Sequence, residues 1–202
     1  MTIVAVTVAG VALANATGGL TRTQARAIAG SINLADVPGF SIAPLERATP
    51  AGGGCGAGVS HGPALATKVS GTFNRTVAGN AQELNSTVVV WPAASDATAL
   101  LAYRRSLRGR ACLARVLKRG TPAGTTEALS DLAAAPPGGF GLRVRLDVGG
   151  SLDYIDLLGF ARGPADVSVS FVYEAVPPTR RLERRLVREL QARATAALPN
   201  AR

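Results

Sequence analysis

The sequence predicts an α+β fold, in which a twisted antiparallel sheet of about five strands has helices packed on it. Two stretches near the C-terminal end, residues 142–148 and 166–174, alternate apolar and polar side chains, as half-buried strands do. At 179–198, apolar residues recur at helical spacing and indicate an amphipathic helix. Together with the elements that precede them, these stretches give the order helix, two strands, two helices, three strands, helix.

The N-terminal part supplies a helix and two strands. Thr21 and Gln24 have the spacing of a capping box, which predicts a helix over about 22–31. Strands are expected near 66–75 and 83–91, because the turn sequence Val77-Ala78-Gly79-Asn80 lies between these two stretches.

A helix pair is expected next. The first helix runs from Pro92 to Leu107, Gly109 breaks it, and the second helix runs from Arg110 to Lys118. Residues 41–63 and 119–139 are rich in glycine, proline and alanine, so both are expected to be loops.

The first two C-terminal strands form a hairpin. Gly149 and Gly150 tolerate the positive φ angles of a two-residue turn. This turn places Arg143 opposite Asp156, a favourable cross-strand pair of charges. The same register makes three further pairs: Arg145 with Tyr154, Val144 with Ile155, and Leu142 with Leu157.

The third of these strands is expected after a three-residue loop at 162–164. That loop length puts Val169 opposite Leu157 and Phe171 opposite Ile155, so the apolar face continues and the helix at 179–198 can cover it. The other face is then mainly polar, although Leu158 and Phe160 also point to it. It is either the floor of a small-molecule cleft or the solvated side of the sheet, and it carries six candidate ligand-binding residues: Arg143, Arg145, Tyr154, Asp156, Ser168 and Ser170.

Composition limits the classes of partner. A chain of 202 residues with 47% hydrophobic and 17% charged residues is expected to be globular. The net charge of +9 favours anionic partners such as acidic lipid or an anionic wall polymer. Aromatic residues make up only 4%, too few for a stacking platform, so nucleic acid is not expected.

The first sixteen residues have the pattern of a secretory signal peptide. Ile3 to Leu13 is a short apolar run, and Ala14-Asn15-Ala16 matches a small-x-small cleavage site. No Lys or Arg precedes the run, so the alternatives are a start codon upstream or an apolar strand. We expect a signal peptide at 1–16 and a single extracytoplasmic domain at 20–200.

Cys55 and Cys112 are the only cysteines, and in an exported protein such a pair favours a disulfide. The alternative is two separate thiols. A third possibility is a hydrolase that uses Cys55 with His61, the only histidine, but no third group is placed to orient the pair. One histidine and two cysteines are too few for a zinc site, so neither a metal nor a cofactor is expected.

Arginines cluster in the helix pair and in the last helix, which can be solvated surfaces or can dock to an anionic surface. Docking would make the protein peripheral to a membrane or attached to an envelope polymer. The candidate contact residues are Arg104, Arg105, Arg108, Arg180, Arg184 and Arg188.

The order of these elements is similar to a known family. A helix leads to a cysteine in a glycine-rich loop, a hairpin ends in Thr-Val-Val-Val-Trp-Pro-Ala-Ala-Ser-Asp-Ala, and a helix pair carries the second cysteine in Ala-Cys-Leu-Ala. The chain resembles the extracytoplasmic sensor domain of actinobacterial receptor serine/threonine kinases and its stand-alone exported relatives, over about residues 20–200. The resemblance implies a twisted antiparallel sheet with flanking helices, disulfides and a ligand cleft.

The leading hypothesis is therefore an exported, non-enzymatic ligand-binding or sensor-like domain of the cell envelope. The second is an envelope protein that docks to anionic lipid or polymer through its arginine-rich helices. The third is the Cys55/His61 hydrolase.

Overall fold

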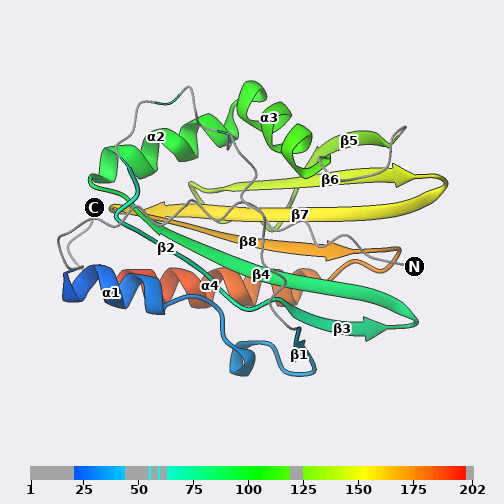
Figure 1. Ribbon diagram of the computed structural model, residues 1–202, viewed down its shortest axis with the longest axis horizontal. Coiled ribbons are helices and arrows are strands. Elements are labelled where there is room, and N and C mark those ends of the chain that lie inside the picture. The colour runs from blue at the N-terminus through cyan, green and yellow to red at the C-terminus, as the bar shows by residue number, and fades with distance from the viewer. Residues whose placement is uncertain (1–20, 44–54, 56–58, 60–62, 119–124, 199–202) are drawn as a thin grey trace.

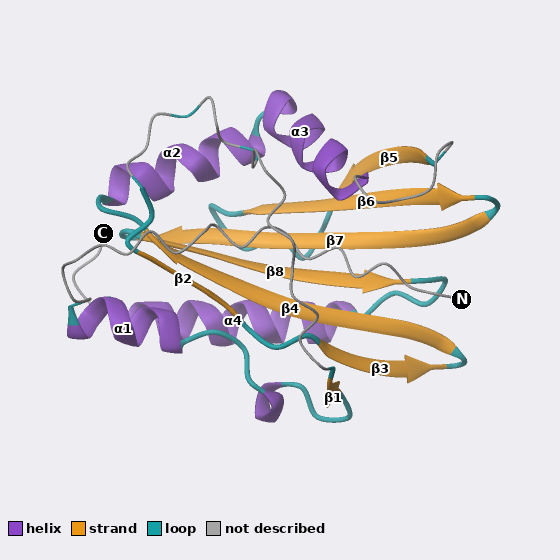
Figure 2. Ribbon diagram, viewed as in Figure 1, coloured by secondary structure: helices purple, strands orange, loops and turns teal. Residues whose placement is uncertain are grey.

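A computed structural model describes residues 21–43, 55, 59, 63–118 and 125–198, and it shows one antiparallel sheet of eight strands between two groups of helices (Figures 1 and 2). The strands are β1 (Ser41–Ile42), β2 (Ala66–Val69), β3 (Phe73–Val77), β4 (Asn80–Val90), β5 (Thr126–Asp131), β6 (Phe140–Val148), β7 (Ser151–Arg162) and β8 (Ala165–Tyr173). The helices are α1 (Arg22–Ala29), α2 (Ala94–Arg105), α3 (Leu107–Lys118) and α4 (Arg180–Ala197), with a short 3₁₀ turn at Leu34–Asp36. The mixed α+β class and the antiparallel sheet agree with the prediction.

The sheet has more strands than the expected five, for two reasons. β1 and β5 lie in segments that the sequence predicted to be loops, and those side chains of β5 whose burial is described are all exposed, so they give no apolar alternation. The strand expected near 66–75 is divided into β2 and β3. Val69 is opposite Thr87 of β4 whereas Phe73 is opposite Leu84, so one extra residue forms a bulge between β2 and β3.

The predicted C-terminal hairpin is confirmed. Gly149 and Gly150 have φ of 61° and 88° and form the two-residue turn. Val148 pairs with Ser151, and Arg143 pairs with Asp156, in the register that the sequence predicted. The capping box of α1 is also confirmed, because the Thr21 side chain accepts a hydrogen bond from the backbone of Gln24.

The register between β7 and β8 differs from the prediction by one residue. Arg162 pairs with Ala165, so the loop has two residues rather than three, and Gly163 takes a φ of 51° that allows this tight turn. Because side chains in a strand alternate between faces, a slip of one residue moves each of them to the other face. Val169 now lies opposite Leu158, and Phe171 lies opposite Asp156.

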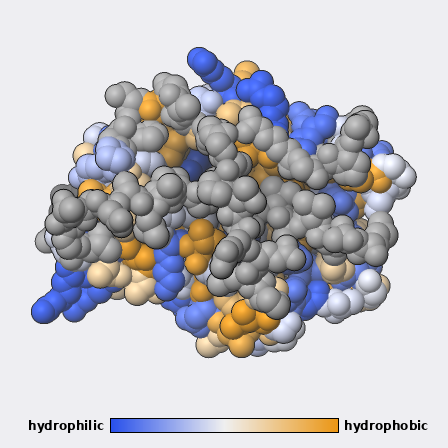
Figure 3. All heavy atoms as spheres, viewed as in Figure 1, coloured by the Kyte–Doolittle hydropathy of each residue, from blue (hydrophilic) through white to orange (hydrophobic). Residues whose placement is uncertain are grey.

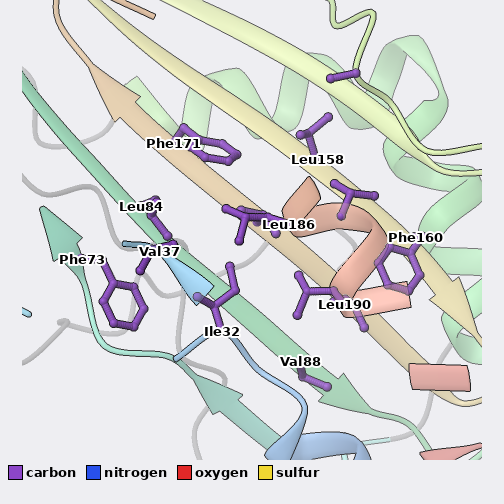
Figure 4. Packing of buried hydrophobic residues seen from close by; sticks show 14 of the residues in the cluster. Ile32, Val37, Phe73, Leu84, Val88, Leu158, Phe160, Phe171, Leu186 and Leu190 are labelled. Carbon is purple, nitrogen blue, oxygen red and sulfur yellow. The ribbon is translucent and has the colours of Figure 1, made fainter. Parts of the chain in front are cut away.

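This register divides the core between the two faces of the sheet. On one face Leu158, Phe160 and Phe171 are buried under α4, whose Leu186 and Leu190 lie among them (Figure 4). On the other face α2 and α3 cover the apolar residues of β6 and β7, which are Leu142, Val144, Leu146, Ile155 and Leu157. The expectation that the last helix covers this second face is wrong. Val169 and Phe171 lie on the same face as Leu158 and Phe160, and α4 packs on that face.

Candidate functional site

The six predicted ligand-binding residues do not share a face. Arg143, Arg145, Tyr154 and Asp156 belong to the α4 side of the sheet, whereas Ser168 and Ser170 pair with Gly159 and Leu157 on the α2–α3 side. The expectation of one polar face is wrong, and its cause is the one-residue slip between β7 and β8. Arg145 is exposed, whereas Asp156 and Ser170 are buried.

Asp156 is the centre of a closed polar cluster beneath α4, which we call the Asp156 cluster. Its carboxylate has 0% exposure and is bound by Arg143 through two contacts of 2.7 Å, Nε to Oδ1 and Nη2 to Oδ2. The hydroxyl of Tyr173 donates to Oδ2 at 3.1 Å. The cluster thus meets the rule that a buried charge is paired and hydrogen-bonded.

A second carboxyl group, Glu183 of α4, joins this cluster from above. Burial, the negative charge of Asp156 and a hydrogen bond with Asp156 together raise its pKa to about 7, although Arg143 and Arg180 act in the opposite direction. Two carboxylates in one buried site resist being charged together. Glu183 therefore holds a proton in mildly acidic solution and begins to lose it near neutral pH.

Two aromatic rings complete the cluster. Tyr154 and Tyr173 stack with their centroids 5.2 Å apart, and the Arg143 guanidinium lies 5.9 Å and 5.7 Å from the two rings. Burial and the nearby Asp156 raise the pKa of Tyr173. The Asp156 cluster therefore joins α4 to the sheet, and the buried carboxylate at its centre is satisfied by partners within the protein.

A second buried aspartate, Asp166 of β8, lies on the opposite face. Burial raises its pKa, and Arg104 of α2 counteracts this by binding its two carboxylate oxygens, each at 2.7 Å. The guanidinium of Arg104 is also 5.7 Å from the centre of the Phe140 ring. Arg104, a predicted surface contact, is thus held by a buried partner.

The Arg104–Asp166 pair borders a surface hollow of about 220 Å³, which we call the α2–α3 hollow. Arg105 also lines it, as does Arg110, whose Nη1 lies 2.8 Å from Oδ1 of Asp131. The rest of the lining is formed by residues 132, 135 and 139–142. Hydrophilic side chains project above α2 and α3 at the upper edge of the molecule in Figure 3.

Two further hollows, of about 330 Å³ each, adjoin along α4 and share Pro137 and Gln191; together we call them the α4 groove. One wall is the segment 133–138, and Phe160, Ala161 and Arg162 contribute from the end of β7. The other wall is one stripe of α4: Arg184, Val187, Arg188, Gln191 and Thr195.

The predicted contact arginines therefore fall on opposite sides of the sheet. Arg105 and Arg108 are exposed on the α2–α3 side, and Arg180, Arg184 and Arg188 are exposed on α4. The sequence analysis missed Arg110, Arg162 and Glu183, because each acquires its role from a neighbour distant in sequence. The spacing of Arg184, Arg188, Gln191 and Thr195 along one helix stripe was the available signal for the groove.

The disulfide between Cys55 and Cys112 is confirmed, with the two Cα atoms 5.6 Å apart. It joins residue 55 to α3. Because Cys55 is bonded, it offers no thiolate, and the Cys55/His61 hydrolase hypothesis loses its nucleophile. His61 and the predicted signal peptide at 1–16 lie outside the described residues.

Within the described ranges, no three or more His, Cys, Asp and Glu side chains are grouped so that they could hold a metal ion. Among the helices of that same part of the chain, none combines the length and apolarity needed to cross a bilayer. Comparisons with protein-family models, curated proteins and solved structures find no match to this chain. The similarity to receptor-kinase sensor domains stays a prediction.

Proposed function

We propose that the protein is an exported, non-enzymatic binding domain of the cell envelope, as its similarity to kinase sensor domains implies, and that its ligand is anionic. The observation that carries the proposal is the lining of its surface hollows. Six arginines and one aspartate line the α2–α3 hollow and the α4 groove. Arginine binds carboxylate and phosphate oxygens in a two-pronged geometry, so hollows lined in this way favour oxyanions.

The extracytoplasmic location is supported by the disulfide. Such bonds form and persist in oxidising compartments and are rare in reducing ones. The strongly basic chain, with its net charge of +9, also suits an envelope rich in anionic lipid and polymer.

The binding proposal is tested with the purified, disulfide-bonded protein. We expect it to bind polyphosphate or poly-glutamate, while neutral dextran leaves it free. The logarithm of the affinity should fall linearly with the logarithm of the salt concentration, because each ion pair formed releases counterions. Absence of binding to every anionic probe at low salt would remove the proposal.

A second candidate function is peripheral docking to acidic lipid, which one observation favours. Leu107, at the junction of α2 and α3, is 85% exposed and lies between the exposed residues Arg105 and Arg108. An apolar side chain flanked by cations suits insertion at a charged membrane interface. Docking predicts that Leu107→Ser weakens binding to phosphatidylglycerol vesicles several-fold, while the variant binds soluble polyanions as before.

A further inference from the structure

We infer that the ligand site is the α4 groove and that it binds a linear polyanion as a single extended chain. The inference rests on the proposed function and names its site and ligand class. It follows from the shape of the groove, from its charge, and from a buried guanidinium nitrogen that has no acceptor.

The shape favours an extended ligand. The lining residues of α4 run from Arg184 to Thr195, a rise of about 16 Å at ~1.5 Å per residue. The opposite wall, 133–138, has the sequence Ala-Ala-Ala-Pro-Pro-Gly, whose small side chains leave space and whose prolines fix the backbone. The two hollows, of about 330 Å³ each, adjoin along the helix, so the groove is elongated and already formed.

The charge of the groove is of one sign. Arg184 and Arg188 line one of the two hollows, and Arg162 lines the other, so cations stand in both halves. Among the described residues, no carboxylate lines either hollow. A chain with oxyanions along its length can therefore contact both halves at once, whereas a single small anion reaches only one.

Arg162 provides an independent observation, a donor that the described residues leave unsatisfied. Its Nε is buried and has no hydrogen-bond partner among the described residues. A buried donor without an acceptor is destabilising, more so when the group is charged. Arg162 lines one half of the groove, so an oxyanion bound there would supply an acceptor once the side chain turns toward it.

The α2–α3 hollow is a weaker candidate by the same criteria. There Arg104 is neutralised by Asp166 and Arg110 by Asp131. Arg105 is the one arginine of that lining for which the described residues supply no salt-bridge partner. A strong site for a polyanion needs several cations that are not neutralised by an internal carboxylate. Among the described residues Arg162, Arg184 and Arg188 form no salt bridge, and Arg188 donates only to the backbone oxygen of Arg184.

The test uses the full oxidised chain and three probes: long-chain polyphosphate, poly-glutamate and vesicles of phosphatidylglycerol. Arg162→Gln and the double variant Arg184→Gln/Arg188→Gln each remove charge from one half of the groove. We expect the affinity for polyanion to fall about tenfold per arginine, the usual effect of losing one charged contact. The slope against salt should also shrink by about one for each arginine removed.

Arg181→Gln is the matched control, and Arg105→Gln tests the competing α2–α3 hollow. Arg181 is exposed on α4 outside the groove, and Arg105 lines the other hollow, so both make the same change of charge elsewhere. We expect each to reduce affinity less than twofold. Because Arg162 is half-buried, Arg162→Lys is made as well; it keeps the charge and should restore part of the binding, with unchanged folding by circular dichroism.

The outcomes separate the site from the function. Equal losses in the groove variants and the controls, or a loss confined to Arg105→Gln, would overturn the groove and leave anionic binding standing. Binding to vesicles alone would overturn the single-chain ligand. A preference between polyphosphate and poly-glutamate identifies the oxyanion, and no binding to any probe removes the proposed function together with the groove.

Discussion

Two buried aspartates on opposite faces of one sheet show how the groups around a carboxylate decide the role of an ion pair. Asp156 and Asp166 are both almost inaccessible, and each is held by an arginine at 2.7 Å. Around Asp156 the space is filled by Tyr173 and by Glu183 of α4. Arg104, the partner of Asp166, instead lines an open hollow of about 220 Å³. Solvent exposure of the arginine does not separate the pairs, because Arg143 is 32% exposed and Arg104 only 17%; what differs is the number of groups that gather around each carboxylate.

A polar cluster on a sheet is therefore not by itself a ligand-binding site. The Asp156 cluster has the donors, acceptors and raised pKa that are typical of functional sites. Yet the carboxyl groups of Asp156 and Glu183 are buried beneath α4, and the three hollows described above lie elsewhere, along α4 and beside α2 and α3. Its perturbed carboxyl group reports burial and a neighbouring charge, which are properties of a structural network as well.

The largest effect we expect is from Asp156→Ala. It removes the partner of Arg143 and the acceptor of Tyr173 in one step, leaving a cation and a hydroxyl unsatisfied. Breaking a buried ion pair in this way costs about 4 kcal/mol in the free energy of unfolding. Urea denaturation followed by circular dichroism measures the loss. A loss below about 1 kcal/mol would mean that α4 does not enclose the cluster in solution.

Asp166→Ala makes the same substitution on the other face. We expect a smaller loss, about 2 kcal/mol, since among the described contacts Asp166 serves Arg104 alone, whereas Asp156 also accepts a hydrogen bond from Tyr173. The same denaturation measurement ranks the two variants. If Asp166→Ala cost more than Asp156→Ala, the number of groups that depend on the carboxylate would not be what distinguishes the pairs.

The difference between the pairs also explains what the sequence could predict. Arg143 and Asp156 lie 13 residues apart across a two-residue turn, so the alternation of the strands and Gly149-Gly150 set their register. Arg104 and Asp166 lie 62 residues apart on a helix and a strand, and only the packing of α2 on the sheet brings them together. Local sequence patterns predict the pairing of strands within a hairpin, whereas a pair such as Arg104 and Asp166 gives no periodic pattern in the sequence.

The loop length of the second hairpin was predicted wrongly for a related reason. Arg162-Gly163-Pro164 is compatible with loops of two or three residues, and the choice depends on which face buries Val169 and Phe171. Apolar residues were present on both faces of β7, in Leu157 and in Leu158, so the hydrophobic pattern did not select one register. The six-residue polar face depended on that choice and was lost with it.

Glu183→Gln tests whether the Asp156 cluster responds to pH. The pKa of Glu183 is raised to about 7 in the folded protein, above its ordinary value of 4.5, so folding favours the protonated form. The wild-type protein should therefore lose stability as pH rises from about 5 through 7, by about 1 kcal/mol after solvent screening. Gln cannot ionise, so the variant should show a flatter profile over this window and exceed the wild type at pH 8.

Glu189→Gln is the control for this experiment. Glu189 lies on the same helix and pairs with Arg185 at 3.9 Å on a half-buried surface, away from Asp156. The substitution is chemically identical, and we expect the pH profile of the wild type to be retained. Parallel profiles for all three proteins would show that Glu183 does not titrate against Asp156 in this range.

The smallest effect separates the two stacked tyrosines. Tyr173→Phe removes the hydroxyl that donates to Asp156 at 3.1 Å but keeps the ring, the stacking on Tyr154 and the contact with Arg143. A single buried hydrogen bond to a carboxylate contributes about 1 kcal/mol, so unfolding should become easier by that amount. Tyr154→Phe makes the same change in a partly buried ring that does not contact Asp156 through its hydroxyl, and we expect it to be nearly neutral. Arg143 still binds both oxygens of Asp156 in either variant. If Tyr173→Phe nevertheless lowered the free energy of unfolding by several kcal/mol, the tyrosine rather than the arginine would be what stabilises this buried charge.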